Sequence, residues 1–260
     1  MEKIDRRRHY ILILDTETAN TLTTDSGDLD MSCVLFYDCG WAVVDTRGNI
    51  YETASYVNKD IFVDRRDLMQ SAYYKDKLPQ YSEDIRDGRR IMATTYEIRK
   101  AMLETIAKYG IKEVAAFNAR FDDNALKVTQ RYCTSSKWRF WFPFDSVEIW
   151  DIMKMAQDVI CAMPTYQRFC EANGYTTKTG KPRKTAEILY RFISNDNSFV
   201  ESHTGLEDVL IEAAIMKYCY RQKKAMRKRL YEEVREFPAN TPFQIELLAS
   251  LRKEPMIRRG

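Results

Sequence analysis

The chain has 260 residues, of which 45% are hydrophobic and 30% are charged, and 41 basic residues against 38 acidic ones leave a formal net charge of +3. This composition indicates a globular chain with ample length for a core and excludes an intrinsically disordered one. No apolar run reaches the roughly 20 residues of a membrane helix. Six cysteines without a C-x-x-C pair indicate neither a zinc site nor a disulfide framework, so we expect a cytoplasmic protein with reduced thiols.

An apolar run that ends in two acids is the first element. Residues 11–14 read Ile-Leu-Ile-Leu, short enough for a buried strand, and Asp15 and Glu17 follow. Because side chains alternate in a strand, the two carboxylates project on the same side. Repulsion between the two carboxylates would raise the pKa of each, and a divalent cation such as Mg²⁺ or Mn²⁺ would remove this repulsion. The stretch alone fits equally well a strand that exits into solvent, with its acids in the following turn.

The remaining elements follow from periodicity, caps and turns along the chain. The first three expected strands form an antiparallel meander with a turn at Gly48, and Thr94 caps the first long helix, which stops at Gly110. Strands are expected at residues 11–14, 34–44, 50–57 and 114–117 and in the aromatic segment 138–144. Longer helices are expected at about residues 94–109, 122–132, 151–163, 165–172, 186–193 and 203–221.

Two more acidic motifs lie where the chain passes from one element to the next. Asp122 opens a helix in the sequence Asn-Ala-Arg-Phe-Asp, and residues 203–208, which read His-Thr-Gly-Leu-Glu-Asp, open a late helix. Taken singly, Asp122 fits a favourable charge at a helix N-terminus, Asp208 an exposed helix face and His203 a surface histidine. The order D-x-E, N-A-x-F-D and H-x-x-x-x-D is more specific than any of its parts.

In these motifs the chain resembles the DEDD superfamily of 3′→5′ exonucleases, in its histidine-containing DEDDh branch. The resemblance runs from about Tyr10 to Lys217 and rests on residues 14–18, 117–122 and 203–208. The spacing H-x-x-x-x-D argues against the branch that uses a tyrosine in the third motif.

Some positions depart from the family pattern. Asp123 stands beside Asp122, and we choose Asp122 because the family places its acid directly after an aromatic residue, here Phe121. The loop after Glu17 is long, and residues 221–260 have no assigned counterpart.

The resemblance implies an α/β fold, a ribonuclease-H-like mixed five-stranded sheet flanked by helices. Residues 1–222 would form the exonuclease domain, and residues 223–260 a basic helical extension packed on the same domain. The resemblance also implies two Mg²⁺ or Mn²⁺ ions per active site, about 4 Å apart. The metal-holding and catalytic acids would be Asp15, Glu17, Asp122 and Asp208.

The roles of these residues are expectations from the resemblance. Asp15 would bridge both ions, Glu17 and Asp208 would hold the ion that carries the water, and Asp122 would support the second ion. His203 would be the general base, because an unperturbed pKa near 6.5 suits proton removal around neutral pH.

The expected reaction is release of nucleoside monophosphates from nucleic-acid 3′ ends, with single-stranded DNA as the expected substrate. Thr16, Thr18 and Asn118 are expected to contact the 3′ end, and the basic segments 178–184 and 221–229 could hold phosphates. A homodimer or a polymerase or replication partner remains open, and no membrane partner is expected.

Two alternatives stay open. The first is an RNA-trimming exoribonuclease or oligoribonuclease on the same fold, because recognition of a 2′-hydroxyl depends on local geometry. The second is a non-catalytic nucleic-acid-binding module. The presence of all five catalytic candidates, from Asp15 to Asp208, speaks against the second.

Overall fold

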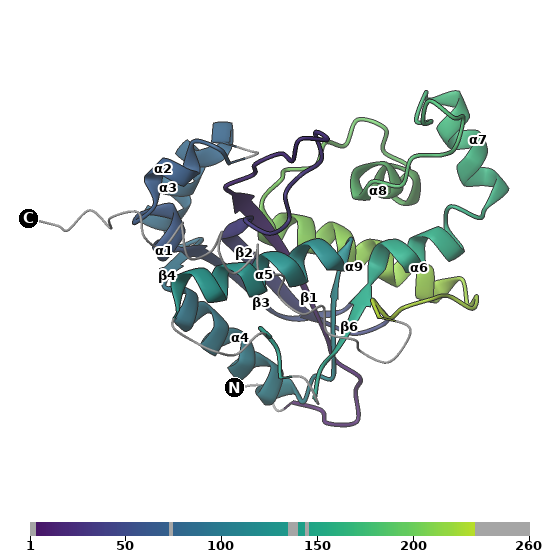
Figure 1. Ribbon diagram of the computed structural model, residues 1–260. Coiled ribbons are helices and arrows are strands. Elements are labelled where there is room, and N and C mark those ends of the chain that lie inside the picture. The colour runs from purple at the N-terminus through teal and green to yellow at the C-terminus, as the bar shows by residue number, and fades with distance from the viewer. Residues whose placement is uncertain (1–3, 73–74, 135–139, 144–145, 232–260) are drawn as a thin grey trace, which may run out of the picture.

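A six-stranded mixed sheet forms the centre of the protein (Figure 1). The computed structural model describes residues 4–72, 75–134, 140–143 and 146–231. The strand order is β4-β3-β2-β1-β5-β6. The strands are β1 (Ile11–Ala19), β2 (Leu35–Val44), β3 (Ile50–Asn58), β4 (Ile91–Ala93), β5 (Glu113–Ala116) and β6 (Glu148–Asp151). The expected antiparallel meander β1-β2-β3 is confirmed, and β4, β5 and β6 add parallel pairings on its two sides.

The sheet differs from the expected five strands at its two edges. β4 has only three residues, two of them exposed, so it carries no alternating apolar pattern. β6 follows the aromatic segment in which the fifth strand was expected, and its last residue, Asp151, also caps the next helix. A strand of four residues that turns directly into a helix has too few positions to show a period of two.

Helices cover both faces of the sheet. They are α1 (Lys59–Phe62), α2 (Arg66–Met69), α3 (Leu78–Arg86), α4 (Thr95–Tyr109), α5 (Ala119–Cys133), α6 (Ile152–Val159), α7 (Pro164–Ala172), α8 (Ala186–Ser194) and α9 (Gly205–Arg221), with a short 3₁₀ turn, η1 (Lys75–Lys77). The expected start of α4 is confirmed, because Thr94 and Glu97 form a reciprocal capping box, and the helix ends at Gly110 with φ 66°. No helix in the described ranges is long and apolar enough to cross a membrane.

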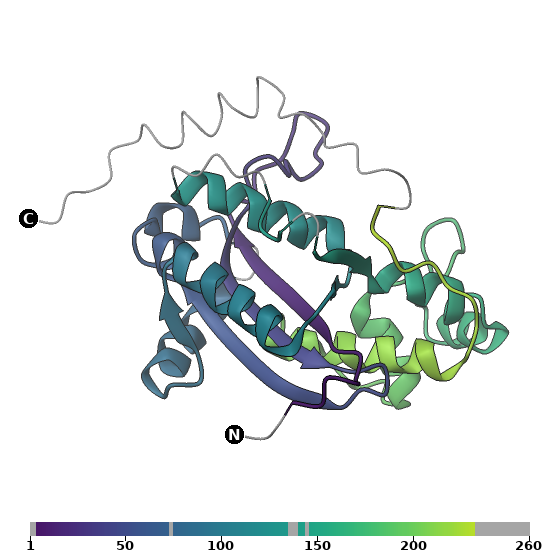
Figure 2. The same ribbon diagram turned by 90° about the horizontal axis from the view of Figure 1, so that it is seen from below.

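Alternation along β1 decides which helices each side chain meets. Ile11 and Ile13 lie in the core with α6, α8 and α9, whereas Leu12 and Leu14 lie in the core with α4 and α5. Figure 2 shows α5 and α9 on opposite sides of the strands. Continuing the alternation, Asp15 and Glu17 project toward α9, and Thr16 projects toward α5.

The first turn of α9 lies against the backbone of β2. A Cβ atom on Gly40 would be 2.2 Å from the backbone nitrogen of Leu206, and one on Gly205 would be 2.7 Å from the backbone nitrogen of Gly40. Only residues without a side chain permit such an approach. The two glycines therefore set the distance between α9 and the sheet.

The chain leaves α9 through a turn at Lys223, and the helical extension expected from residue 223 is wrong for residues 223–231. These residues run beside β6, where the Asp151 N–H donates to the Lys228 carbonyl at 2.7 Å and the Leu230 N–H donates to the Ile149 carbonyl at 2.8 Å. Backbone pairing of this kind covers the outer edge of β6 and satisfies its hydrogen-bonding groups. The rest of the expected extension, residues 232–260, lies outside the described residues.

Replacing Gly40 with alanine should lower the free energy of unfolding by about 3 kcal/mol, the upper end of the cost of adding a methyl group to a close-packed contact. The added Cβ meets backbone atoms, which cannot rotate away. Urea denaturation of Gly40→Ala measures the loss, and Thr53→Ala, at an exposed position on the neighbouring strand β3, is the control and should change stability by less than about 0.5 kcal/mol. Equal stability of the two variants would contradict the close approach.

Candidate active site

The three acidic motifs meet at one end of β1. One ligand atom each of Glu17, His203 and Asp208 lies within 4.8 Å of the others. Asp15 keeps some exposure to solvent but lies deep among protein atoms, and its pKa is raised well above its ordinary value, first by burial and then by the charge of Asp122. Residues from β1, α5 and α9 therefore share one site although they are far apart in the sequence.

The acids of this site strongly disfavour carrying their charges together. Burial is the main cause of the raised pKa values of Glu17 (about 9), Asp208 (about 8) and Asp122 (about 7). The next cause for Glu17 is the charge of Asp208, and the next for Asp208 is the charge of Glu201. Crowded carboxylates of this kind offer hard oxygen ligands and an excess of negative charge, which is the environment that Mg²⁺ and Mn²⁺ prefer.

Asp122 is held in the site by Thr16. The Thr16 backbone N–H and the Thr16 hydroxyl both donate to Oδ1 of Asp122, at 3.0 Å and 2.8 Å. These bonds lower the pKa of Asp122 against the effect of burial. The neighbouring Asp123 is engaged elsewhere, because it pairs with Lys127 and accepts a hydrogen bond from the Tyr231 hydroxyl at 2.9 Å. The structure thus brings Asp122, and not Asp123, to the acids of β1.

The residues expected to contact substrate have different surroundings. Thr16 is 4% exposed, and both of its donors are used on Asp122. Thr18 is buried as well. Asn118 is exposed and lies at the N-terminus of α5, where its backbone N–H donates to Oδ1 of Asp151 at 3.3 Å. Among the three, Asn118 retains the most room for a ligand.

Two motif residues adopt the left-handed backbone region. His203 has φ 52° and Asn118 has φ 61°. Such conformations cost a residue with a side chain on the order of 1–3 kcal/mol and gather at functional sites. Neither conformation could be read from the residue order.

The surroundings of His203 favour the neutral form of its imidazole. Burial lowers the pKa of His203, Lys77 lowers it further, and Glu187 acts in the opposite direction. Nδ1 of His203 lies 3.9 Å from Oε2 of Glu201. A lowered pKa favours the neutral ring at neutral pH, which is the form that a general base requires.

Comparison with solved structures yields matches to exonucleases, whereas no family model and no curated protein matches this chain. A full-length 3′-exonuclease has 12% sequence identity and a TM-score of 0.54, with 89% of this chain and 93% of that chain covered. The nuclease domain of 3′hExo, described as a DEDDh family member bound to rAMP, has 12% identity and a TM-score of 0.53, with 86% and 98% covered. The chain has the fold of the DEDD 3′→5′ exonucleases.

Exonuclease I is a longer relative of the same fold. The enzyme from Methylocaldum szegediense has 18% identity and a TM-score of 0.51, with 83% of this chain covered but only 41% of that chain. The present chain therefore spans about two fifths of the length of exonuclease I.

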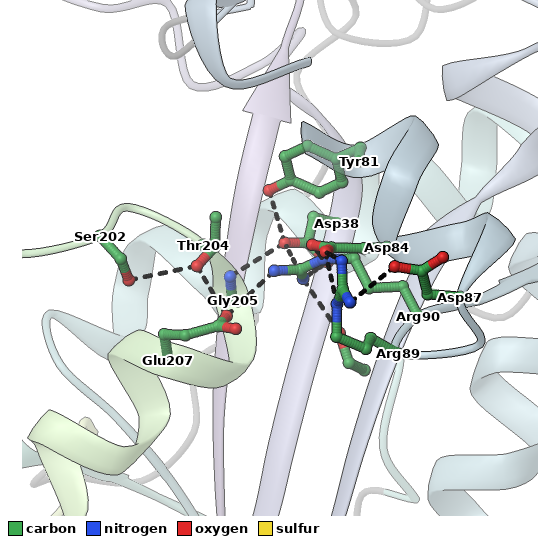
Figure 3. Close-up of polar contacts among 11 residues, drawn as sticks. Asp38, Tyr81, Asp84, Asp87, Arg89, Arg90, Ser202, Thr204, Gly205 and Glu207 are labelled. Atoms are coloured by element: carbon green, nitrogen blue, oxygen red, sulfur yellow. Dashed lines mark hydrogen bonds and ion pairs between the residues drawn. The ribbon is translucent and has the colours of Figure 1, made fainter. Parts of the chain in front are cut away.

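A buried ion-pair network ties the third motif to the DEDD exonuclease sheet (Figure 3). Asp38, which is opposite Glu17 in the β1–β2 register, is fully buried and accepts hydrogen bonds from the Gly205 N–H at 2.9 Å and the Tyr81 hydroxyl at 2.7 Å. Arg90 donates to Asp38 at 3.1 Å and to Glu207 at 3.0 Å. The network thus joins β2, α3 and the first turn of α9, which carries Asp208.

Three residues of this region were missed by sequence reasoning. Glu212 lies one helical turn after Asp208, so the spacing could have revealed it. Asp38 is the only acid in the otherwise largely apolar sequence of β2, and an acid in such a strand indicates a buried partner. Arg90 follows a charged, irregular segment and carries no local signal.

Replacing Arg90 with alanine should lower the free energy of unfolding by about 3–5 kcal/mol, because Asp38 would be left as a buried charge without its partner. The Arg90 side chain is 2% exposed, whereas the Arg89 side chain is 57% exposed. Arg89 pairs with the exposed Asp87 and with the buried Asp84, which Arg90 also holds. Arg89→Ala is therefore the matched control, with an expected loss of at most about 1 kcal/mol. Thermal and urea denaturation of both variants measure the difference, and equal losses would contradict the role of burial.

Proposed function

We propose that the protein is a divalent-metal-dependent 3′→5′ exonuclease that releases nucleoside monophosphates from nucleic-acid 3′ ends, with single-stranded DNA as the main substrate. The proposal rests on one observation, the convergence of the acids of β1, α5 and α9 with His203. The DEDD exonuclease fold supports it, because the neighbours are themselves exonucleases.

The residues present fit the implied cations. Glu17, His203 and Asp208 offer ligand atoms close enough to share one ion. We propose that Asp15, Glu17, Asp122 and Asp208 hold two Mg²⁺ or Mn²⁺ ions. Bound ions would acidify the attacking water and stabilise the charge that develops on the phosphate.

The protein's own groups would position and move a proton. His203 would accept the proton of the attacking water, since its environment favours the neutral ring. Thr16 would hold Asp122 through its two hydrogen bonds, which gives it a positioning role in place of the substrate contact expected from the sequence. Asn118 remains our proposal for contact with the 3′ end, and Thr18 would act through its backbone.

The loop between α7 and α8 is our proposal for the contacts with substrate phosphates. Lys178, Lys181 and Lys184 are exposed there. In the other basic segment, Arg227 pairs with Asp158 at 2.8 Å and Arg229 with Glu148 at 2.6 Å, so these two charges are already compensated. We therefore propose that the loop lysines hold the backbone of the strand.

Replacement of Asp15 with alanine should abolish hydrolysis in a folded protein, because Asp15 is central to the acid cluster. His203→Ala should lower turnover on the order of 10²-fold or more, the usual contribution of a general base. Single-turnover hydrolysis of an end-labelled oligonucleotide measures both. Glu171→Gln, at an exposed position on α7, is the control and should keep wild-type turnover. Undiminished hydrolysis by the Asp15 variant would defeat the proposal.

A panel of labelled substrates tests the reaction itself. Single- and double-stranded DNA and RNA, each labelled at the 5′ end or the 3′ end, are incubated with Mg²⁺ or Mn²⁺ and with EDTA. We expect a ladder that shortens from the 3′ end of single-stranded DNA, mononucleotide products, and no products in EDTA. Faster loss of RNA would favour an exoribonuclease, and binding without any product would favour a non-catalytic module.

A further inference from the structure

Glu212 is a buried acid on the sheet-facing side of α9. It is 3% exposed. Asp208, Glu212, Ile215 and Cys219 are all buried, and their spacing of four, three and four residues places them on one face of the helix. That face packs against β1 and β2, toward which Asp15 and Glu17 also project.

Within the described part of the chain, Oε2 of Glu212 is buried and has no hydrogen-bond partner. A buried carboxylate without a compensating group is costly, so a purely structural glutamate is normally paired with arginine, lysine or several donors. The backbone N–H of Phe117 acts to lower the pKa of Glu212, against the effect of burial.

The surroundings of Glu212 are mostly acidic. Asp122 and Asp208 add to the effect of burial in raising the pKa of Glu212 well above its ordinary value. Glu212 in turn raises the pKa of Asp15, and its effect there ranks ahead of that of Glu17. Glu212 lies one helical turn after Asp208 on the face of α9 that packs against β1, the strand that carries Asp15. An ion shared by several oxygen ligands would remove the repulsion there.

We infer that Glu212 is a fifth carboxylate of the cation site and helps to hold the Mg²⁺ or Mn²⁺ ion that Asp15 and Asp122 face. The inference rests on the proposed function, and it adds an acid to the four of the DEDD motifs. The competing explanation is a permanently protonated Glu212 that serves only the packing of α9.

Mn²⁺ binding to Glu212→Gln separates the two explanations. Glutamine keeps the size of the side chain and removes its charge, so loss of a ligand should weaken Mn²⁺ binding by at least about 10-fold, the lower end of what is lost when a supporting group of a metal site is removed. Isothermal titration of the full chain with Mn²⁺ alone measures the affinity. Glu171→Gln is the matched control and should bind Mn²⁺ as the wild type does.

Melting temperatures in EDTA give a second readout. Here Glu212→Gln should do no harm to stability, whereas it should weaken Mn²⁺ binding. Without metal, Glu212→Gln should melt at or above the wild-type temperature, because one charge has left a crowded acidic cluster. With saturating Mn²⁺, its rise in melting temperature should be smaller than that of the wild type. Unchanged Mn²⁺ affinity, or a variant that is less stable than the wild type in EDTA or does not fold, would overturn the inference, since the carboxyl would then serve packing.

The same titration on Asp15→Asn keeps this inference apart from the proposed function. If Asp15→Asn loses Mn²⁺ binding and Glu212→Gln does not, the role of Glu212 fails and the cation site stands. If both variants bind Mn²⁺ as the wild type does, the cation site itself fails, and the proposed function fails with it.

Discussion

Electrostatic repulsion among carboxylates at the end of β1 is the constraint on which the rest of the site depends. Asp15, Glu17, Asp122 and Asp208 all have raised pKa values, and burial is the first cause in each case. A folded chain tolerates such a cluster when other contacts hold its members in place and when protons or a cation neutralise their charges. The surrounding structure supplies the first of these conditions.

Two sets of contacts hold the acids from opposite faces of the sheet. On the α5 face, both donors of Thr16 fix Asp122. On the α9 face, Asp38 accepts the Gly205 N–H, and Arg90 compensates Asp38. Each set joins a residue of the β1–β2 pair to the first turn of a helix, so the distance between motifs is fixed by backbone elements and not by the acids themselves. The acids are therefore free to face a ligand.

Much of this arrangement could be predicted from the sequence, because it depends on local patterns. The apolar run before Asp15, the turn at Gly48 and the cap at Thr94 each specify an element through their own residues. The two edge strands could not be predicted in this way, because three or four residues are too few to define a period. The path of residues 228–230 depends on hydrogen bonds to β6, a partner about 80 residues earlier in the chain.

Some residues of the candidate site could likewise be predicted from the sequence, and others could not. The motif acids could be found because their order in the chain matches a known pattern, and the structure brings them together. The role of Thr16 could not be found from the sequence, because a threonine between two acids gives no indication that its hydroxyl and its N–H both reach Asp122. Arg90 reaches Glu207 from 117 residues away, a contact that only the tertiary fold creates.

The basic residues show why charge in a sequence is a poor guide to nucleic-acid contacts. The segment 221–229 is the densest positive run, yet Arg227 and Arg229 are paired with acids of α6 and β6, and Lys228 lies over the Trp150 ring at 5.1 Å. These cations hold the segment against the edge of the sheet. Because they are already paired locally, they attract phosphate less strongly. The exposed lysines of the α7–α8 loop carry no such acidic partner among the described ion pairs, so fewer charges there can contribute more to binding. The net charge of +3 thus does not indicate which basic residues are available to bind phosphate.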